Sequence, residues 1–311
     1  MRSPHRREVS AFLATKRPWS HHGGQGHALN SLRSRQRGFT LVELVLVIAL
    51  AGVVAVLIST VLSRPLQGFV DQSRRAELTD QAATALNRMA RDIRMAVPNS
   101  VRESPGTNGL DFVPLHEVGR YQGSLDEHGV LHDPPICDTD PCRISMVTDL
   151  EAASVVESRW LVIYNLGAES GGVPVDGQNL WAYQAPGVVT PSNARFELDV
   201  SGSSQRLVVK DAIGFRFAFA SPQRRLYLAR EAVRYRCDLA TGVLWRETFY
   251  TLDLTKPPLS RTPLADSVSH CAFTYQHGTH TRNALITLRL SLSKGGETIS
   301  LVQQVHVDNA P

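Results

Sequence analysis

The chain has 311 residues, long enough for one or two domains with a sizeable core, and 42% of them are hydrophobic, as in an ordinary globular protein. Its formal net charge is +4, but residues 1–38 alone carry +7, which leaves 25 basic and 28 acidic side chains, a net charge of −3, on the other 273 residues. Because the basic character is confined to one end, charge argues against a nucleic-acid-binding protein, and we expect no nucleic-acid partner.

The N-terminal part predicts a disordered segment followed by a membrane span. Residues 1–36 are rich in Arg, His, Ser and Gly and have no apolar period. Residues 39–62 are mostly apolar, and as a helix they would rise about 36 Å, against roughly 30 Å of hydrocarbon in a bilayer. Arg33, Arg35 and Arg37 precede the run, so the positive-inside rule places residues 1–38 in the cytoplasm and the chain after Leu62 outside. The run is too long for an ordinary secretory signal, and no small-x-small cleavage site ends it.

Glu43 is the one charged residue inside the apolar run. A carboxylate costs roughly 2.5–3.5 kcal/mol at the centre of a bilayer, so we expect this acid to have a partner. If a protease cuts after the small residue Gly38, the new α-amine of Phe39 has an unperturbed pKa near about 8 and lies one helical turn from Glu43. In a bundle, Glu43 can pair instead with the amine of a neighbouring chain, and this pairing would set the register between helices.

A second helical pattern spans about residues 66–97 and ends at Pro98. Its apolar stripe has spacings of 4, 3, 4 and 4, as in an amphipathic helix, and consists of Ala82, Leu86, Met89, Ile93 and Val97. Most charged side chains lie off the stripe and are expected to form a solvated face; they are Arg74, Arg75, Arg88, Arg91 and Asp92. Pro65 predicts a kink near residues 62–65.

The four cysteines, Cys137, Cys142, Cys237 and Cys271, all follow the apolar run and would lie outside the cytoplasm. An even number in an oxidising compartment favours disulfides, and of three possible connectivities the local pairs Cys137–Cys142 and Cys237–Cys271 are preferred. A zinc site is the competing interpretation, but the spacings do not match the usual Cys-x2-Cys. Residues 99–142 are rich in Pro, Gly and Asp and are predicted to form a linker. It would contain a surface loop closed by the Cys137–Cys142 disulfide.

From about residue 110 the hydrophobic period changes to two, which predicts strands. Strands are expected at 160–164, 180–183, 215–219, 226–228, 233–237, 243–245, 286–292 and 299–307, with turns at 221–224, 240–242 and 295–296. The row Phe215, Phe217 and Phe219 is read as the core face of a sheet in preference to a stacking platform for sugars or bases. The fold class is therefore α+β, a long N-terminal transmembrane and stalk helix followed by a β-rich antiparallel head.

No catalytic pattern stands out: the chain lacks Gly-x-Ser-x-Gly, His-Glu-x-x-His, a P-loop and a Gly-rich dinucleotide turn. Four histidines in the C-terminal part are scattered and have no nucleophile paired with them; they are His270, His277, His280 and His306. The Asp138-x-Asp140 pair lacks the rest of an EF-hand loop. We expect no enzyme activity, no cofactor and no metal.

The segment Gly38-Phe39-Thr40-Leu41-Val42-Glu43 resembles the class III signal sequence of type IV prepilins and of type II secretion pseudopilins. In that family a membrane-embedded prepilin peptidase cleaves after the Gly and methylates the new N-terminal Phe, and the Glu is needed for assembly. The resemblance implies cleavage between Gly38 and Phe39, N-methylation of Phe39, and an assembly role for Glu43. It implies a leader at 1–38, a membrane and stalk helix at 39–97 and a periplasmic head at 98–311.

Three C-terminal segments, 235–238, 242–246 and 268–275, together with the ending 304–311, resemble large minor pilins. They are similar to J-type pseudopilins and more so to the MshO family of mannose-sensitive haemagglutinin (MSHA) pilus biogenesis proteins. The resemblance implies a subunit for the initiation or tip of a type IV pilus. It would be made in the bacterial inner membrane with its head in the periplasm and would then join the pilus at the cell surface.

The partners implied are the prepilin peptidase, other major and minor pilins and the inner-membrane assembly platform. A type II secretion pseudopilin, a head that binds a ligand such as a surface glycan, and a membrane-anchored enzyme remain as alternatives. Two features depart from the family pattern: the leader of 38 residues is long, and Thr60 stands where many type IV pilins have Pro.

Overall fold

The structure, a computed structural model, describes residues 38–126, 128–202, 204–278 and 282–307, and for 62–67 and 125 it describes the backbone alone. Within these residues the chain forms two helices and 19 strands, paired antiparallel in five sheets. The expected α+β class, with one N-terminal apolar helix and a β-rich head, is therefore confirmed. The chain divides into two compact units, residues 1–61 and 62–311, which are described separately.

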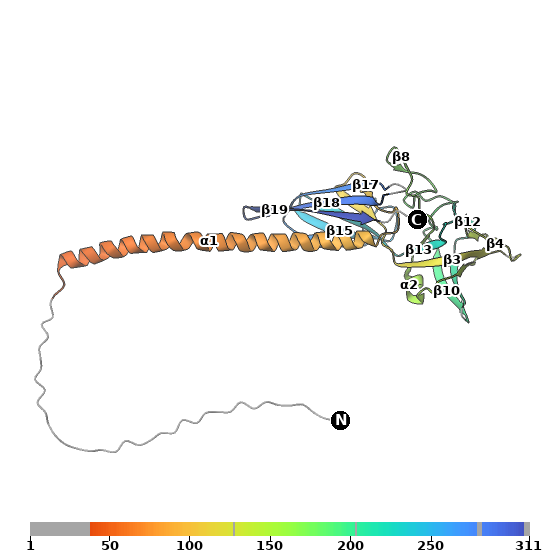
Figure 1. Cartoon of the computed structure of the whole chain (residues 1–311), viewed down its shortest axis with the longest axis horizontal. Coiled ribbons are helices and arrows are strands. Elements are labelled where there is room, and N and C mark those ends of the chain that lie inside the picture. Colours follow the sequence, from red (N-terminus) through yellow and green to blue (C-terminus); the bar gives the residue numbers. More distant parts are fainter. Residues whose placement is uncertain (1–37, 127, 203, 279–281, 308–311) are drawn as a thin grey trace, which may run out of the picture. The chain divides into compact units, whose positions relative to one another are not determined.

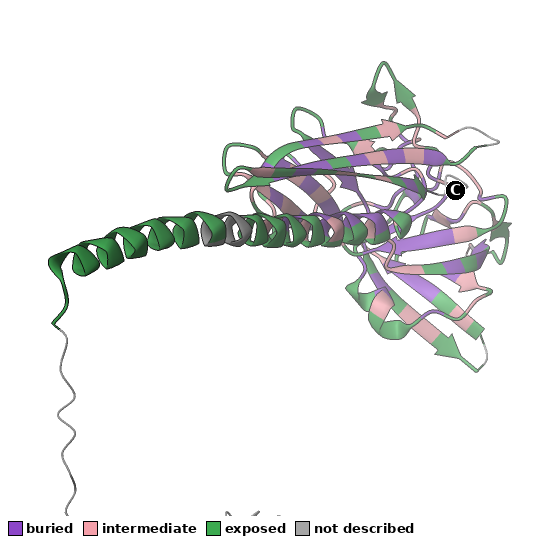
Figure 2. Ribbon diagram, turned by 60° about the vertical axis from the view of Figure 1, so that its left-hand side comes forward, coloured by how far each residue is buried: buried purple, intermediate pink, exposed green. Residues whose placement is uncertain are grey.

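The first unit contains the N-terminal part of helix α1 (Leu41–Arg94). Its 21 residues Leu41–Val61 are long and apolar enough to cross a membrane. Every residue of this stretch is exposed, and Figure 2 shows it green around its whole circumference. Apolar surface of this extent requires cover from lipid or from other protein.

The second unit contains the rest of α1, whose apolar stripe is buried as expected. Ala82, Met89 and Ile93 are at 0% exposure, and Leu86 and Val97 are at 2% and 1%. The helix ends at Arg94, three residues before the expected boundary, because the following residues pair with another segment. The Val97 N–H donates to the Val113 carbonyl at 2.8 Å, and the Leu115 N–H donates to the Met95 carbonyl at 2.7 Å. α1 is one continuous helix through Pro65, and a change of axis direction there stays a prediction.

The buried stripe of α1 packs on two antiparallel sheets, which share one core with it. The three-stranded sheet is a meander in the order β17-β18-β19, and its strands lie alongside the C-terminal part of α1 (Figure 1). Its strands are β17 (Val268–Gln276), β18 (Ala284–Lys294) and β19 (Glu297–Val307). The five-stranded sheet consists of β1 (Arg102–Glu103), β2 (Gly109–Phe112), β14 (Ala232–Asp238), β15 (Val243–Phe249) and β16 (Ser260–Ala265), in that order.

A seven-stranded sheet has buried residues on both faces. Along the order β10-β11-β6-β3-β13-β7, with β4 paired to β3, its strands are β10 (Arg195–Ser201), β11 (Ser204–Lys210), β6 (Cys142–Met146), β3 (Glu117–Leu125), β13 (Arg225–Ala229), β7 (Trp160–Val162) and β4 (Leu131–His132). On β13, Leu226 and Leu228 belong to one core, whereas Tyr227 and Ala229 belong to another. The short helix α2 (Ala152–Glu157) contributes Val155 to the first of these cores.

Two small sheets complete the described fold, and they correct the expected strand at 215–219. β12 (Phe215–Arg216) pairs with β5 (Ile136–Cys137), and β8 (Glu169–Ser170) pairs with β9 (Val173–Pro174). The strand therefore covers only the first two of the expected residues 215–219 and contains one Phe of the row, Phe215. Phe215 and Phe217 are nevertheless buried, with ring centroids 5.0 Å apart, which matches the core interpretation.

Two other local predictions were wrong. Residues 180–183 form turns, not a strand, because side chains take the place of a partner strand: the Leu180 N–H donates to Asn165 Oδ1 and the Trp181 N–H to Asn179 Oδ1. The expected linker at 99–142 contains β1 to β5 and the first residue of β6. β1, β4 and β5 have two residues each, too few to show a period. The longer strands β2 and β3 pair with β14 and β13, which lie far away in the sequence.

Candidate functional site

The predicted cleavage site lies just before α1. Gly38, Phe39 and Thr40 precede the helix, and Phe39 is 76% exposed. A Cβ atom added at Gly38 would meet nothing within 4 Å, so packing within the described chain does not require a glycine there. The small size of residue 38 is consistent with a requirement from outside the fold, such as access by a protease.

Glu43 has a local role that sequence reasoning missed. Its backbone N–H donates to Thr40 Oγ1 at 3.3 Å, so Thr40 caps the first turn of α1. The pattern Thr40-x-x-Glu43 is that of a capping box, in which a Glu at the third helical position can reach back to the cap residue. The acidic side chain is also favourable near the positive end of the helix dipole. The pattern was present in the sequence and gives Glu43 a role within its own helix.

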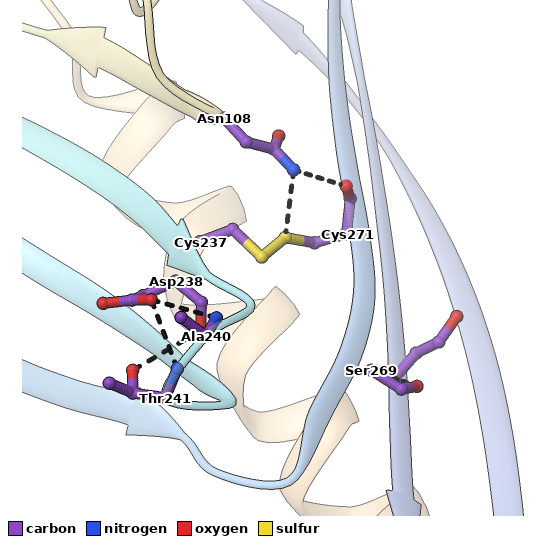
Figure 3. The surroundings of a disulfide bond; sticks show 8 residues. Asn108, Cys237, Asp238, Ala240, Thr241, Ser269 and Cys271 are labelled. Carbon is purple, nitrogen blue, oxygen red and sulfur yellow. Dashed lines mark hydrogen bonds between the residues drawn. A yellow bond between two sulfur atoms is a disulfide. The ribbon is translucent and has the colours of Figure 1, made fainter.

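The four cysteines form the two disulfides expected from the sequence, Cys137–Cys142 and Cys237–Cys271. The second connects β14 of the five-stranded sheet with β17 of the three-stranded sheet, and Figure 3 shows Asn108 beside it. Asn108 Nδ2 donates to the Cys271 carbonyl at 2.9 Å. The disulfide therefore holds together segments 235–238 and 268–275.

The hairpin turn after Cys237 is capped by Asp238. Its Oδ1 accepts the Ala240 N–H at 3.2 Å and the Thr241 N–H at 3.3 Å (Figure 3). These hydrogen bonds, that from Thr241 above all, lower the pKa of the Asp238 carboxyl. Gly242 completes the turn with a φ of +66°, which favours glycine. The predicted turn at 240–242 is confirmed.

The other disulfide closes a short exposed loop, but both of its cysteines are buried, at 1% and 2% exposure. They belong to the core beneath the seven-stranded sheet. Asp138, within the loop, pairs with Arg216 at 3.0 Å, and Asp140 Oδ1 accepts the Asp211 N–H at 3.2 Å. Among the described residues, no group of three or more His, Cys, Asp or Glu side chains is placed to hold a metal ion.

A polar cluster lies between α1 and the five-stranded sheet. Asp92, predicted to face solvent, accepts the Tyr235 hydroxyl at 2.6 Å and Arg246 Nε at 3.1 Å. Arg246 also donates to Glu231 at 3.2 Å. Burial, together with the hydrogen bond to Asp92, raises the pKa of Tyr235 far above its ordinary value. The alternation of β14 indicated that Tyr235 is buried, but no sequence signal identified its partner, 143 residues away.

The head contains a cavity of about 850 Å³, which sequence reasoning did not anticipate. Its lining includes Arg102 on β1, Arg234 on β14 and three aromatic residues, Trp160, Trp181 and Tyr183. The other polar residues of the lining are Thr107, Thr190, Ser192, Asn193, Thr251, Asp253 and Thr255, and the other apolar ones are Pro105, Leu180, Pro191, Leu252 and Leu254. The volume falls within the ~300–1,000 Å³ typical of small-molecule sites.

The histidines considered in the sequence do not converge. His270 and His306 are exposed on β17 and β19, and His277 lies 3.9 Å from Glu169, which leaves the default interpretation of isolated side chains unchanged. His280 lies outside the described residues, as does the segment 1–37 that precedes the cleavage motif.

Comparison with known proteins identifies one family motif. Residues 33–59 match the family model of the prokaryotic N-terminal methylation motif. No curated protein and no solved structure matches the chain. The matched segment includes Gly38, Phe39 and Glu43 and most of the apolar stretch Leu41–Val61. The chain thus carries a type IV prepilin-like methylation motif on a single apolar helix, followed by a β-rich head.

Proposed function

We propose that the chain is a minor pilin, a non-enzymatic subunit for the initiation or tip of a type IV pilus of the MSHA type. The observation that carries the proposal is the methylation motif at residues 33–59, which overlaps a 21-residue apolar helix exposed on all sides. Exposure of this apolar surface to water is unfavourable both before and after assembly. The helix therefore needs a bilayer around it before assembly and neighbouring helices around it in the pilus.

Processing follows from the motif. Prepilin peptidase cleaves between Gly38 and Phe39 and methylates the Phe39 amine, and Glu43 then pairs with the amine of a neighbouring subunit. Residues 1–38 leave as the leader, 39–97 form the membrane and stalk helix, and 98–311 form the periplasmic head. The other partners are major and minor pilins and the assembly platform of the inner membrane, and the finished pilus carries the subunit to the cell surface.

The size of the head supports a priming or tip position, because a compact unit of residues 62–311 would hinder close packing along a filament shaft. A J-type pseudopilin of a type II secretion system shares the same N-terminal motif and is the competing function. Neighbouring genes separate the two, since a pilus cluster and a secretion cluster encode different platforms. Even labelling of pili along their length by a tagged chain would contradict the tip position.

The central test is the N-terminal sequence and mass of the full chain made in cells with and without prepilin peptidase. The expected product starts at N-methylated Phe39 only where the peptidase is present. Gly38→Val should block cleavage, whereas Gly52→Val is the matched control, because a Cβ at either glycine meets nothing within 4 Å. A mature chain that starts anywhere else, or equal cleavage of Gly38→Val, would overturn the proposal.

A further inference from the structure

We propose that the cavity of the head binds an acidic saccharide, a polyhydroxylated ring that carries a carboxylate, with Arg102 as the residue that recognises the charge. This binding site goes beyond the proposed function and does not depend on it. The argument rests on three properties of the cavity: an incompletely neutralised guanidinium, aromatic side chains in the wall and a hydroxyl-rich rim.

The first property is the pairing of the two arginines that line the cavity. Two guanidinium groups, those of Arg102 and Arg234, share one fully buried carboxylate, that of Asp111. Arg234 engages both oxygens of Asp111, at 2.7 and 3.0 Å, and its third nitrogen donates to the Leu254 carbonyl at 3.1 Å. Each of the three nitrogens of Arg234 therefore has a partner, and such bidentate pairing with a carboxylate is the stronger kind.

Arg102 interacts with Asp111 more weakly than Arg234 does. Its Nη2 lies 3.4 Å from Asp111 Oδ2, and its Nε is buried without a hydrogen-bond partner among the described residues. Burial lowers the pKa of Arg102 despite the nearby carboxylate, which is the expected result when neutralisation is incomplete. The side chain keeps 17% of its surface exposed and lines the cavity. An anionic group in the cavity would complete its pairing.

The acidic groups near the cavity do not supply that partner. Asp253 lies on the rim, where it accepts hydrogen bonds from Thr255 and lies 3.9 Å from Lys256. Glu169 also acts on Arg102 electrostatically, but it is outside the cavity lining and lies 3.9 Å from His277. Arg102 is one guanidinium with N–H donors left to pair with an anion. Its single positive charge matches the single negative charge of a carboxylate better than the double charge of a phosphate.

The second property is the aromatic wall. The Arg102 guanidinium lies 4.1 Å from the centroid of the Trp181 ring, and Trp181 Nε1 donates to the Ser100 carbonyl at 2.9 Å, so this wall is held in place. Tyr183 stacks on Phe215 at 6.5 Å and is still 51% exposed. Its open face offers a flat apolar surface next to the charged group, which is what one face of a sugar ring can cover.

The third property is the rim, where exposed hydroxyl and amide side chains come from three separate segments. Thr107, Ser192, Asn193 and Thr255 are all exposed and line the opening. Such groups both donate and accept hydrogen bonds, as sugar hydroxyls do. A charged arginine, an aromatic wall and a hydroxyl rim together describe an acidic saccharide site.

The test is calorimetric titration of the detergent-solubilised full chain with three acidic probes: an oligogalacturonate, a hyaluronan oligosaccharide and sialyllactose. The matched neutral probes are the carboxyl-reduced forms of the first two and lactose. We expect at least one acidic probe to bind and its neutral counterpart to bind at least about 10-fold more weakly, since a charge-assisted hydrogen bond is worth that much. AMP serves as a probe for a phosphate-and-base ligand.

Arg102→Gln should weaken binding of the acidic probe by about 10-fold or more, and Arg102→Lys should restore part of it, because charge is kept and the planar fork is lost. Tyr183→Ala should weaken binding of acidic and neutral probes together. The control is Arg206→Gln, an exposed arginine on β11 outside the cavity. Near-ultraviolet circular dichroism shows whether each variant is folded.

Failure of all three acidic probes to bind the folded wild-type chain would overturn the proposal, and so would equal binding of the neutral probes or binding of AMP alone. Should Arg102→Gln fail to fold, the comparison of acidic with neutral probes on the wild-type chain and the Tyr183→Ala variant decide the matter. None of these outcomes depends on cleavage at Gly38, so they are distinct from failure of the pilin assignment.

Discussion

The Tyr235 hydroxyl on β14 donates a hydrogen bond of 2.6 Å to Asp92 Oδ2 on α1. Tyr235 is fully buried in the core that the helix stripe shares with the two sheets. The contact between helix and sheet therefore combines apolar packing with a directional, charge-assisted bond, and Arg246 Nε donates a second one to Asp92 at 3.1 Å. Both bonds favour a single rotation and register of the helix against the sheet.

Tyr235→Phe should lower the free energy of unfolding of the head by about 1.5–3 kcal/mol, the usual worth of a hydrogen bond to a charged group. The ring packing is kept, so the loss reports the hydroxyl alone. Urea unfolding of the detergent-solubilised chain measures it. Tyr183→Phe is the control, with an expected change under about 0.5 kcal/mol because Tyr183 is half exposed. Equal effects of the two variants would show that the bond to Asp92 adds nothing.

The two disulfides should differ in their contribution to stability. The sequence separations are 34 residues for Cys237–Cys271 and 5 residues for Cys137–Cys142. Chain-entropy arithmetic assigns about 4 kcal/mol to the longer loop and about 2 kcal/mol to the shorter one. Double Cys→Ala variants compared by urea unfolding test this order. A larger loss for the short loop would mean that packing around Cys137 outweighs loop entropy.

Glu43 has two candidate roles, helix capping and charge pairing, which Glu43→Gln separates. Gln can still complete a capping box, but it has no charge to pair with an amine. We expect Glu43→Gln, like Glu43→Ala and Glu43→Asp, to be cleaved normally and to fail in assembly. Mass spectrometry follows cleavage, and immunoblots of sheared pili follow assembly.

Thr40→Ala is the matched variant for the capping role. It removes the Oγ1 that accepts the Glu43 N–H and should cost about 1 kcal/mol of helix stability while assembly continues. Normal assembly of Glu43→Gln combined with loss of assembly in Thr40→Ala would assign Glu43 to capping and remove the charge-pairing step.

Alkaline pH should destabilise the head in a specific interval. Burial raises the pKa of Tyr121 and that of Tyr275 to about 12. Each raised pKa means that the unfolded chain loses its proton first, near about pH 10. The stabilisation is fully present below about pH 10 and is lost as the pH rises through about 12.

Unfolding curves over this interval, with tyrosinate absorbance as the second probe, check the expectation. Tyr121→Phe should flatten the fall of stability with pH, whereas Tyr183→Phe should alter it less. An unchanged slope in Tyr121→Phe would show that its hydroxyl, which donates to Asp133 at 3.0 Å, does not contribute to the alkaline transition.

Patterns within a short stretch of sequence predicted their local structure well. The stripe from Ala82 to Val97 is buried because its spacing follows the helical repeat. The turns before β13, β15 and β19 form where Arg224, Gly242 and Gly295 adopt positive φ. In each case the signal and the structure involve the same few neighbouring residues.

Features built from distant segments were not predictable. The strand expected at 180–183 is lost to hydrogen bonds with Asn165 and Asn179, which a local period does not register. The cavity depends on Arg102, Asp111 and Arg234, and the last two are 123 residues apart. From the sequence alone, charged residues in strands are predicted to face solvent. Their ion-pair partners are known only once the strand order shows which of them are neighbours.

The N-terminal features could be identified from the sequence alone, because each is a property of one contiguous stretch: the methylation motif with Gly38, Phe39 and Glu43, and the apolar helix. The number of cysteines is likewise read directly from the sequence. The contacts of Asp92 and Arg102, and the cavity that Arg102 lines, could be seen only in the folded structure. Those contacts form when strands that are far apart in the chain pair with one another. A local hydrophobic period shows that a segment is a strand, but it does not show which distant strand it pairs with.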